Sequence, residues 1–252
     1  MSDYKSENVI LYEYLFANLN SINCFTEKSA NYLTEMMSGS HGKPILAPFD
    51  SPDILVLLND KTLLLEHFQF DSSERKNGGS LLQAEKNIFI KSNSTKKFNV
   101  TQIKNESLIT HYIANLMEST IKHYDKFHQY LKNVSKKQGI IYDGIRKVIN
   151  QEHKEIGLVI EDNSLDYNMF LNRIGSYEYI TCFHIKEFRD FLREHMEVEH
   201  IFHLVVNSTE KRVVYYFHNI LEDLNMLDEI MEYKSPNLIE KADIFFWTKN
   251  KI

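Results

Sequence analysis

The stretch ILVLLNDKTLLLEHFQF, at residues 54–70, decides the fold of this chain. Residues 54–58 form a short, entirely apolar run, which is typical of a strand covered on both faces. The next residues, Asn59 and Asp60, favour a tight turn, and residues 62–70 are rich in strand-forming side chains. The stretch therefore predicts a β-hairpin.

Apolar residues at helical spacing surround this hairpin in the sequence. We expect helices at 6–20 and 26–37 before it, and after it a helix capped by Ser80 and helices at 106–132, 186–197 and 220–232. Glycine and proline residues predict a loop between residues 37 and 54, and 71–80 also has loop composition. Further short apolar runs predict strands at 156–160, 201–206 and 212–217.

The order of these elements predicts an α/β protein, with α+β as the alternative, built on a mixed sheet of about five strands flanked by helices. The helix at 106–132 is the clearest amphipathic segment, and at 1.5 Å per residue it would be about 40 Å long. Its apolar side comprises Ile109, Ile113, Leu116, Ile121, Tyr124, Phe127 and Leu131. We expect residues 1–252 to form a single domain, with 91–150 as a basic helical insertion.

Composition excludes several classes of protein. With 252 residues, 43% hydrophobic and 25% charged, the chain can bury a core and is not a disordered polyampholyte. Eight glycines and four prolines argue against a many-stranded sandwich or a collagen-like repeat. Cys24 and Cys182 are too few for a disulfide framework or a four-thiolate zinc site, so we expect two buried thiols in a reducing compartment.

The start of the chain lacks the pattern of a signal peptide, because Asp3, Glu7 and Glu13 lie where a basic and then apolar stretch would be needed. No apolar run approaches the 18 residues expected of a membrane-spanning helix. The sequence therefore predicts a cytoplasmic protein with no membrane partner.

The middle of the chain is basic although the net charge is −6. From Arg75 to Lys154 there are 15 Lys or Arg residues against 6 Asp or Glu. Lysine predominates, so contact with the backbone of a nucleic acid is favoured over recognition of base edges. The residues expected to bind it are Arg75, Lys76, Lys91, Lys96 and Lys97. The alternative is an ordinary solvated helix face.

Two carboxylates in the hairpin carry the chemistry. Glu66 lies in an apolar strand, where a charge is costly to bury unless a partner or a metal compensates it. Asp53 follows Pro52 at the mouth of the first strand, and a hairpin can bring it close to Glu66. Such a pair suits Mg²⁺ or Mn²⁺. The alternatives are a turn cap for Asp53, and for Glu66 an edge position facing solvent or a salt bridge to a helix lysine.

This arrangement resembles the PD-(D/E)XK nuclease superfamily, which has the restriction-endonuclease-like fold. The likeness lies in an initial helix, a Pro-Asp at a strand, a twelve-residue gap and an acidic strand residue followed by a helix, over about residues 26–90. It implies that Asp53 and Glu66 bind the metal, and that Glu35 or Glu27 of the preceding helix adds a ligand.

One position departs from the family pattern. The family lysine belongs two residues after the acidic residue, where this chain has Phe68. The resemblance allows Lys86 of the next helix to supply the amine and act with Asp53 and Glu66 in catalysis. His67 or Gln69 are further substitutes, although strand alternation points both away from Glu66. The remaining outcome is a site that has lost its activity.

We therefore expect a metal-dependent, nuclease-like protein that hydrolyses phosphodiester bonds of DNA or RNA. The alternative is a non-catalytic binding protein that retains a degenerate nuclease fold. In that case the helix at 106–132 would dock a partner or form a homodimer.

Two other groups of residues are weaker candidates. His200 and His203 could hold zinc with a neighbouring acidic residue, but they span a helix end and a strand start and do not match the zincin pattern. A patch of partly buried histidines that includes His195 is the alternative. On the long helix, His111, Glu118 and Asp125 share a side, which favours a solvated stripe over a ligand row.

Overall fold

The computed structural model describes the following residues: 22–38, 45–48, 53–58, 61–72, 75–76, 79–80, 105–134, 140–142, 145–147, 153–164, 169–171, 177–206 and 212–234. The expected helices at 6–20 and immediately after Ser80 lie outside these ranges, as does the expected turn at Asn59 and Asp60.

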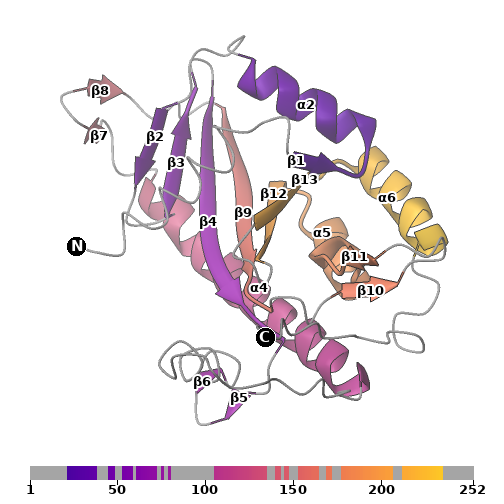
Figure 1. Cartoon of the computed structure of the whole chain (residues 1–252). Coiled ribbons are helices and arrows are strands. Elements are labelled where there is room, and N and C mark those ends of the chain that lie inside the picture. The colour runs from indigo at the N-terminus through magenta and orange to yellow at the C-terminus, as the bar shows by residue number, and fades with distance from the viewer. Residues whose placement is uncertain are drawn as a thin grey trace, which may run out of the picture.

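The protein has an α/β architecture built on one mixed sheet (Figure 1). Its seven strands, rather than about five, lie in the order β1-β13-β12-β9-β4-β3-β2. Strands β4, β9 and β12 are parallel to one another, whereas β3 is antiparallel to β4 and β13 is antiparallel to β12. The bounds are β1 Ile22–Cys24, β2 Ile45–Pro48, β3 Ile54–Leu57, β4 Thr62–Phe70, β9 Lys154–Asp162, β12 Val198–Val206 and β13 Arg212–His218.

The predicted hairpin is confirmed, with Ile54 opposite Leu65 and Leu57 opposite Thr62. The two strands that the sequence did not predict are the outermost, β1 and β2. They have three and four residues, and β2 ends at Pro48, a residue that an edge strand tolerates because one side of it needs no hydrogen bonds. Local composition gives such short edge strands little signal.

Three small two-stranded sheets accompany the main sheet. They pair β5 (Arg75–Lys76) with β6 (Gly79–Ser80), β7 (Ile140–Tyr142) with β8 (Ile145–Lys147), and β10 (Met169–Leu171) with β11 (Tyr177–Tyr179). The prediction of a plain loop at 71–80 was therefore wrong, because Arg75–Lys76 and Gly79–Ser80 pair as strands.

Four α-helices and one short 3-10 helix lie around the sheet in the described part of the chain: α2 Glu27–Met37, α4 Asn105–Val134, η4 Cys182–His184, α5 Lys186–Glu194 and α6 Leu221–Lys234. The helices predicted at 26–37, 106–132, 186–197 and 220–232 are thus confirmed, with small shifts at their ends. Thr26 is the N-cap of helix α2, and its side chain accepts a hydrogen bond from the Ser29 amide, which satisfies one of the unpaired first-turn donors.

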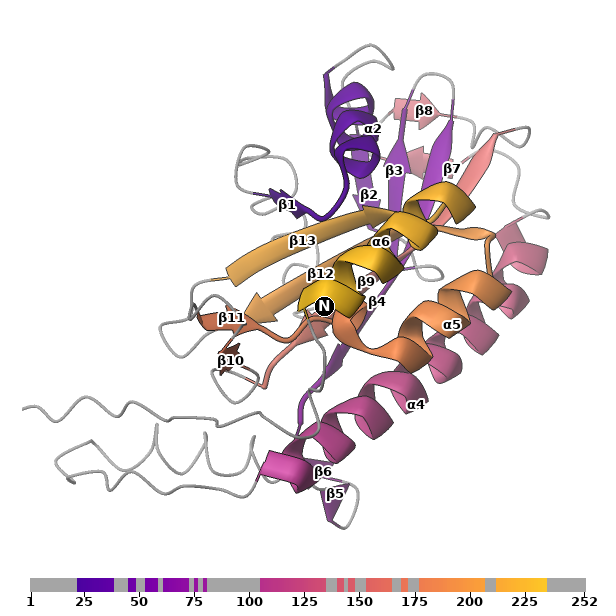
Figure 2. The ribbon, with the colours of Figure 1, turned by 90° about the vertical axis from the view of Figure 1, so that its right-hand side faces the viewer.

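Helix α2 covers one face of the sheet, and α4, α5 and α6 cover the other (Figure 2). Successive side chains of a strand point to opposite faces, so β4 contributes to two cores. Leu63 and Leu65 pack beneath α2, whereas Phe68 and Phe70 pack beneath α4. We call these the α2 face and the α4 face.

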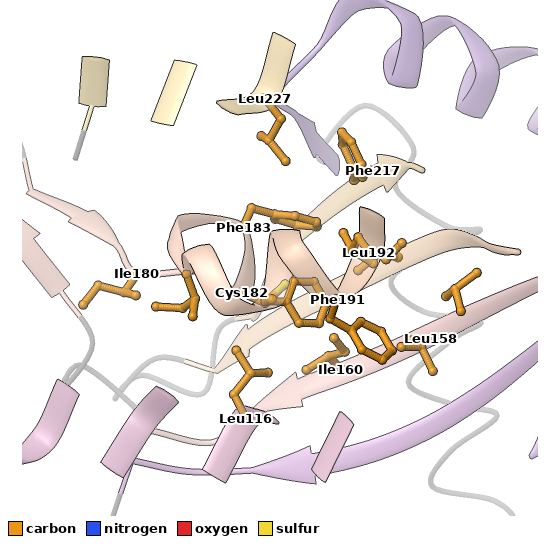
Figure 3. Packing of buried hydrophobic residues seen from close by; sticks show 14 of the residues in the cluster. Leu116, Leu158, Ile160, Ile180, Cys182, Phe183, Phe191, Leu192, Phe217 and Leu227 are labelled. Atoms are coloured by element: carbon orange, nitrogen blue, oxygen red, sulfur yellow. The ribbon is translucent and has the colours of Figure 1, made fainter. Parts of the chain in front are cut away.

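The larger core lies on the α4 face (Figure 3), where Leu116 of α4 packs near Ile160 of β9 and Phe183 and Phe191 of the η4–α5 region. Of the predicted apolar side of the long helix, Ile113, Leu116 and Tyr124 pack in this core, and Phe127 is also buried, whereas the side chains of Ile109 and Leu131 lie outside the described part. Ile121 does not pack in this core, since it is 48% exposed, so its assignment to that side was wrong. Cys182 is buried as expected, whereas Cys24 is only half-buried.

Among the described residues, no helix has the length and apolar character that crossing a membrane requires.

Candidate functional site: a strand hairpin and a second polar cluster

The hairpin places the two predicted carboxylates on neighbouring strands. Asp53 immediately precedes Ile54, whose register partner is Leu65, so the next antiparallel position along β4 is Glu66. The Oδ2 atom of Asp53 accepts a hydrogen bond from the His67 backbone N–H at 2.8 Å. Because the β3–β4 ladder ends at Leu65, this carboxylate satisfies a strand donor beyond the last paired residue. Asp53 therefore has a backbone-capping role, whatever else it binds.

Glu66 points to the α4 face and is buried, with 3% of the residue exposed. Its Oε1 atom lies 2.8 Å from Nδ1 of His123 on α4. Its Oε2 atom has no hydrogen-bond partner among the described residues. A buried carboxylate oxygen without a donor is costly, and a cation or a proton is the usual way to relieve that cost.

His123 also contacts the residue that replaces the family lysine. The imidazole is stacked on the ring of Phe68, with 5.0 Å between ring centroids and 21° between ring planes. A nitrogen base therefore lies beside Glu66 on the face where the missing lysine would have been. Sequence reasoning did not find His123, because it comes from a helix 57 residues further along the chain.

The other proposed substitutes for the lysine do not reach Glu66. His67 Nε2 lies 3.2 Å from Glu161 Oε2, and the side chain of Gln69 donates to the same oxygen at 2.9 Å. All three residues are on the α2 face, as strand alternation predicted. Lys86 lies outside the described residues.

Glu35 and Glu27 are exposed residues of α2, which covers the sheet face opposite to Glu66. The structure therefore does not bring the helix glutamates to the hairpin carboxylates. Of the expected nucleic-acid contacts, Arg75 and Lys76 form β5, while Lys91, Lys96 and Lys97 lie outside the described ranges.

A second polar cluster lies on the α2 face, near the starts of β9 and β12. Glu155 is at its centre: His200 Nε2 is 2.9 Å from Oε2, and Lys61 Nζ is 3.0 Å from Oε1. The Tyr32 hydroxyl of α2 contacts both Glu155 oxygens at 2.9 and 3.0 Å. It also lies 2.6 Å from Lys61 Nζ. Glu199 lies beside this group.

The electrostatics of the two carboxylates differ. Burial alone would raise the pKa of Glu155, but hydrogen bonds from His200 and Lys61 lower it to about 2. No such donor reaches Glu199 from the described residues, and its burial together with the charge of Glu155 raises its pKa to about 7. Burial lowers the pKa of His200 despite the neighbouring Glu155. The cluster thus pairs a strongly ionised carboxylate with one that is easily protonated.

The prediction that His200 and His203 could bind one zinc ion was wrong. They lie on opposite faces of β12, with His200 near Glu155 on the α2 face and His203 near Asp162 on the α4 face. His203 is completely buried, and its burial and the neighbouring His184 lower its pKa to about 3. His195, the third of these histidines, lies 3.5 Å from Glu197. On α4, Glu118 and Asp125 are exposed, as a solvated stripe requires, whereas His111 is half-buried.

Glu155, Glu199 and His200 could hold a metal ion, because one ligand atom from each lies within 4.8 Å of the other two. Within the described ranges, no other three acidic, histidine or cysteine side chains meet that criterion. Asp53 and Glu66 therefore form at most a two-residue site with the described part of the chain.

Comparison with known proteins gives no relative: no protein-family model, curated protein or solved structure matches this chain.

Proposed function

We propose that this protein is a nuclease-like, metal-dependent hydrolase that cleaves phosphodiester bonds of a nucleic acid, with Asp53 and Glu66 as its metal ligands. The observation that carries the proposal is the Oε2 atom of Glu66, which is buried and receives no hydrogen bond from the described residues. The register of the hairpin puts Asp53, just before β3, next to Glu66 of β4. Bound Mg²⁺ or Mn²⁺ would supply Lewis-acid activation of the phosphate and of a water molecule.

The order of elements supports the proposal. Helix α2 precedes the hairpin, Asp53 lies immediately before β3, and Glu66 lies within β4. These are the features by which the sequence resembles the PD-(D/E)XK superfamily. The excess of lysine between Arg75 and Lys154 supports a polyanionic substrate held through its phosphates.

His123 takes the position of a proton-handling group in this proposal. Its Nδ1 atom is engaged by Glu66 Oε1, and its ring rests on Phe68, so the imidazole is held on both sides. A histidine so held can accept a proton from water or stabilise charge on a phosphate, which is the work that the family lysine would otherwise do. Lys86 remains the competing candidate.

The test is cleavage of plasmid and of single-stranded DNA and RNA in Mg²⁺ or Mn²⁺. We expect Glu66→Gln and Asp53→Asn to lower the rate by at least about 100-fold, since even indirect partners of a metal are worth about 10- to 100-fold. Asp125→Asn, which removes an exposed carboxylate from α4 near His123, is the matched control and should cleave normally. Cleavage that survives Glu66→Gln would contradict the proposal.

Comparison of His123→Asn with Lys86→Ala separates the two candidates for the lysine role. If His123 acts, His123→Asn should lower the cleavage rate by at least about 100-fold, whereas Lys86→Ala should leave the rate unchanged.

The alternative function, non-catalytic binding by a retained fold, is favoured by one specific observation. The side chain of Glu66 is only 4% exposed and one of its oxygens is already paired with His123, an arrangement that suits a structural ion pair. Calorimetry with Mn²⁺ separates the two functions. Mn²⁺ binding by the wild type that Glu66→Gln abolishes favours the hydrolase. If the wild type is stably folded but binds no Mn²⁺, the binding protein is favoured.

We also propose a cytoplasmic location, which the free thiols of Cys24 and Cys182 support because a reducing compartment keeps thiols unpaired.

A further inference from the structure

We infer that Glu155, Glu199 and His200 form a second binding site, independent of the hairpin, for one divalent transition-metal ion of the Zn²⁺ class. The site lies on the α2 face at the starts of β9 and β12, whereas Glu66 lies on the α4 face. One ligand atom from each residue is within 4.8 Å of the other two, which is the spacing of groups that share a single cation.

A break in the strand register assembles the ligands. Consecutive residues of a regular strand point to opposite faces, so Glu199 and His200 would normally be separated by the sheet. The β12–β9 ladder is irregular between Val198 and His200: Val198 pairs with Ile156, and His200 pairs with the very next residue, Gly157. This bulge brings two successive side chains to Glu155. Bulges re-aim side chains in this way beside functional sites.

Gly157 completes the fit between the strands. A Cβ atom at this position would lie 2.7 Å from both the Cβ and the carbonyl oxygen of His200, and 2.6 Å from Leu65 Cδ2. Only a residue without a side chain lets His200 approach the backbone of β9 so closely. A glycine in the interior of a strand is unfavourable by itself. We therefore attribute the glycine at position 157 to the close approach of His200.

A contact with a neighbouring strand orients the imidazole of His200. The residue is completely buried, and its Nδ1 atom lies 3.0 Å from the Tyr216 hydroxyl. That contact leaves Nε2 directed at Glu155 Oε2, 2.9 Å away. A metal-binding histidine characteristically has its second nitrogen held by such a partner, which orients the ring.

The charged groups of the second polar cluster favour the binding of a cation. Glu155 is matched by Lys61, but the carboxylate of Glu199 receives no hydrogen bond from the described residues although it lies beside Glu155. Of the two carboxylates, Lys61 contacts Glu155 alone, so a divalent ion bound between Glu155 and Glu199 would offset the repulsion between them. A donor set with imidazole nitrogen suits Zn²⁺, whereas Mg²⁺ prefers oxygen ligands alone.

The experiment is a titration of metal-free full-length protein with Zn²⁺ by calorimetry, and with Co²⁺ by visible absorption as a report on the ligands. We expect one Zn²⁺ per chain, and a loss of at least about 10-fold in affinity for Glu199→Gln. This variant should fold, because Glu199 is half-exposed and only its charge is removed. Glu222→Gln, on an exposed side chain of α6, is the matched control and should bind as the wild type does.

Lys61→Met provides a second, opposite test. The Lys61 ammonium group occupies Glu155 Oε1 and repels an incoming cation, so its removal should tighten Zn²⁺ binding. A purely structural ion-pair network predicts no Zn²⁺ binding by the wild type or by this variant. That result would overturn the inference, as would a wild-type affinity in Glu199→Gln.

Hairpin variants make the two sites distinguishable. Glu66→Gln should leave the Zn²⁺ stoichiometry and the Co²⁺ spectrum unchanged, even if it abolishes cleavage. Zn²⁺ binding that is lost in Glu66→Gln and retained in Glu199→Gln would assign the ion to the hairpin and overturn the second site. Absence of nuclease activity has no bearing on this inference.

Discussion

At the scale of single residues, Gly157 shows how an absent side chain can shape a site. It lies in β9 between apolar residues, where any Cβ would meet His200 and Leu65 at less than 3 Å. The contact with His200 involves its Cβ and backbone oxygen, which cannot rotate away as the end of a long side chain could. The position of His200 in the second polar cluster thus depends on Gly157.

We therefore predict that Gly157→Ala destabilises the fold by about 1–3 kcal/mol, the usual cost of inserting a methyl group into a filled space. Urea unfolding followed by circular dichroism measures this change, with Asn31→Ser on the exposed side of α2 as a control that should behave as the wild type. An unfolding midpoint unchanged by Gly157→Ala would show that the β9–β12 contact can accommodate an additional methyl group.

His203 predicts a dependence of stability on pH. Its pKa falls from 6.5 to about 3 in the folded protein, because it is buried and lies near His184. Between these two values the unfolded chain binds a proton that the folded chain does not. Stability contributed by neutral His203 is therefore complete above pH 6.5 and is lost as the pH falls towards 3.

The expected slope is up to about 1.4 kcal/mol per pH unit for this one proton. Urea unfolding between pH 4 and pH 8 should show a shallower slope for His203→Leu than for the wild type. His218, whose pKa is lowered to about 4, adds to the slope of both proteins. Equal slopes would mean that His203 does not contribute. Measurements at pH 8, where the imidazole is neutral in both states, separate the effect of the substitution itself.

At the scale of elements, α4 is the clearest case of a helix defined by its periodicity. Its apolar residues recur every three or four positions, and the side that carries Tyr112, Leu116 and Phe127 is buried. Because most helical stability in proteins comes from such packing, the contacts with the sheet hold α4 more than its intrinsic propensity does. The same contacts hold His123 against Glu66.

We predict that Leu116→Ala destabilises the protein by about 2–5 kcal/mol, because it leaves a cavity in the core of the α4 face. Ile121→Ala, on the same helix but 48% exposed, should change stability by no more than about 0.5 kcal/mol. Chemical denaturation of both variants checks the contrast. Similar losses for the two would mean that α4 packs differently from the arrangement described here.

At the scale of the whole molecule, the two ends of the described chain stabilise each other. Asp223 of α6 accepts hydrogen bonds from the hydroxyl groups of Thr26 and Ser29, each at 2.7 Å, across 197 and 194 residues of sequence. The early strand β1 also pairs with β13 rather than with a neighbour in sequence. The seven-stranded sheet is therefore complete only when residues from both ends of the described chain are in place.

Asp223→Ala should consequently destabilise the protein by about 2–5 kcal/mol, since it leaves two buried hydroxyl groups without their charged acceptor. Glu222→Ala, at the adjacent exposed position, is the matched control and should stay within about 0.5 kcal/mol of the wild type. Thermal unfolding measures both. A single cooperative transition for Asp223→Ala would show that the two ends unfold with the rest of the sheet.

Local pattern in the sequence was sufficient for the β3–β4 hairpin, the four described α-helices and the central strands, because the periodicity of burial depends on neighbours along the chain. It also placed Asp53 on the strand beside Glu66, since a hairpin couples residues a short distance apart. The edge strands β1 and β2 were missed, because a strand of three or four residues is decided by its partner and not by its own composition.

The surroundings of the candidate sites were decided by tertiary structure alone. His123 reaches Glu66 from α4, and Lys61 just before β4 meets Glu155 of β9 and His200 of β12, so no spacing in the sequence could have indicated either group. Only Gly157, a glycine inside an apolar strand, was a visible signal that something approaches closely there. The sequence by itself determined which faces of the helices and strands would be apolar. The folded sheet determined which charged side chains would face one another, because that depends on register between strands far apart in the chain.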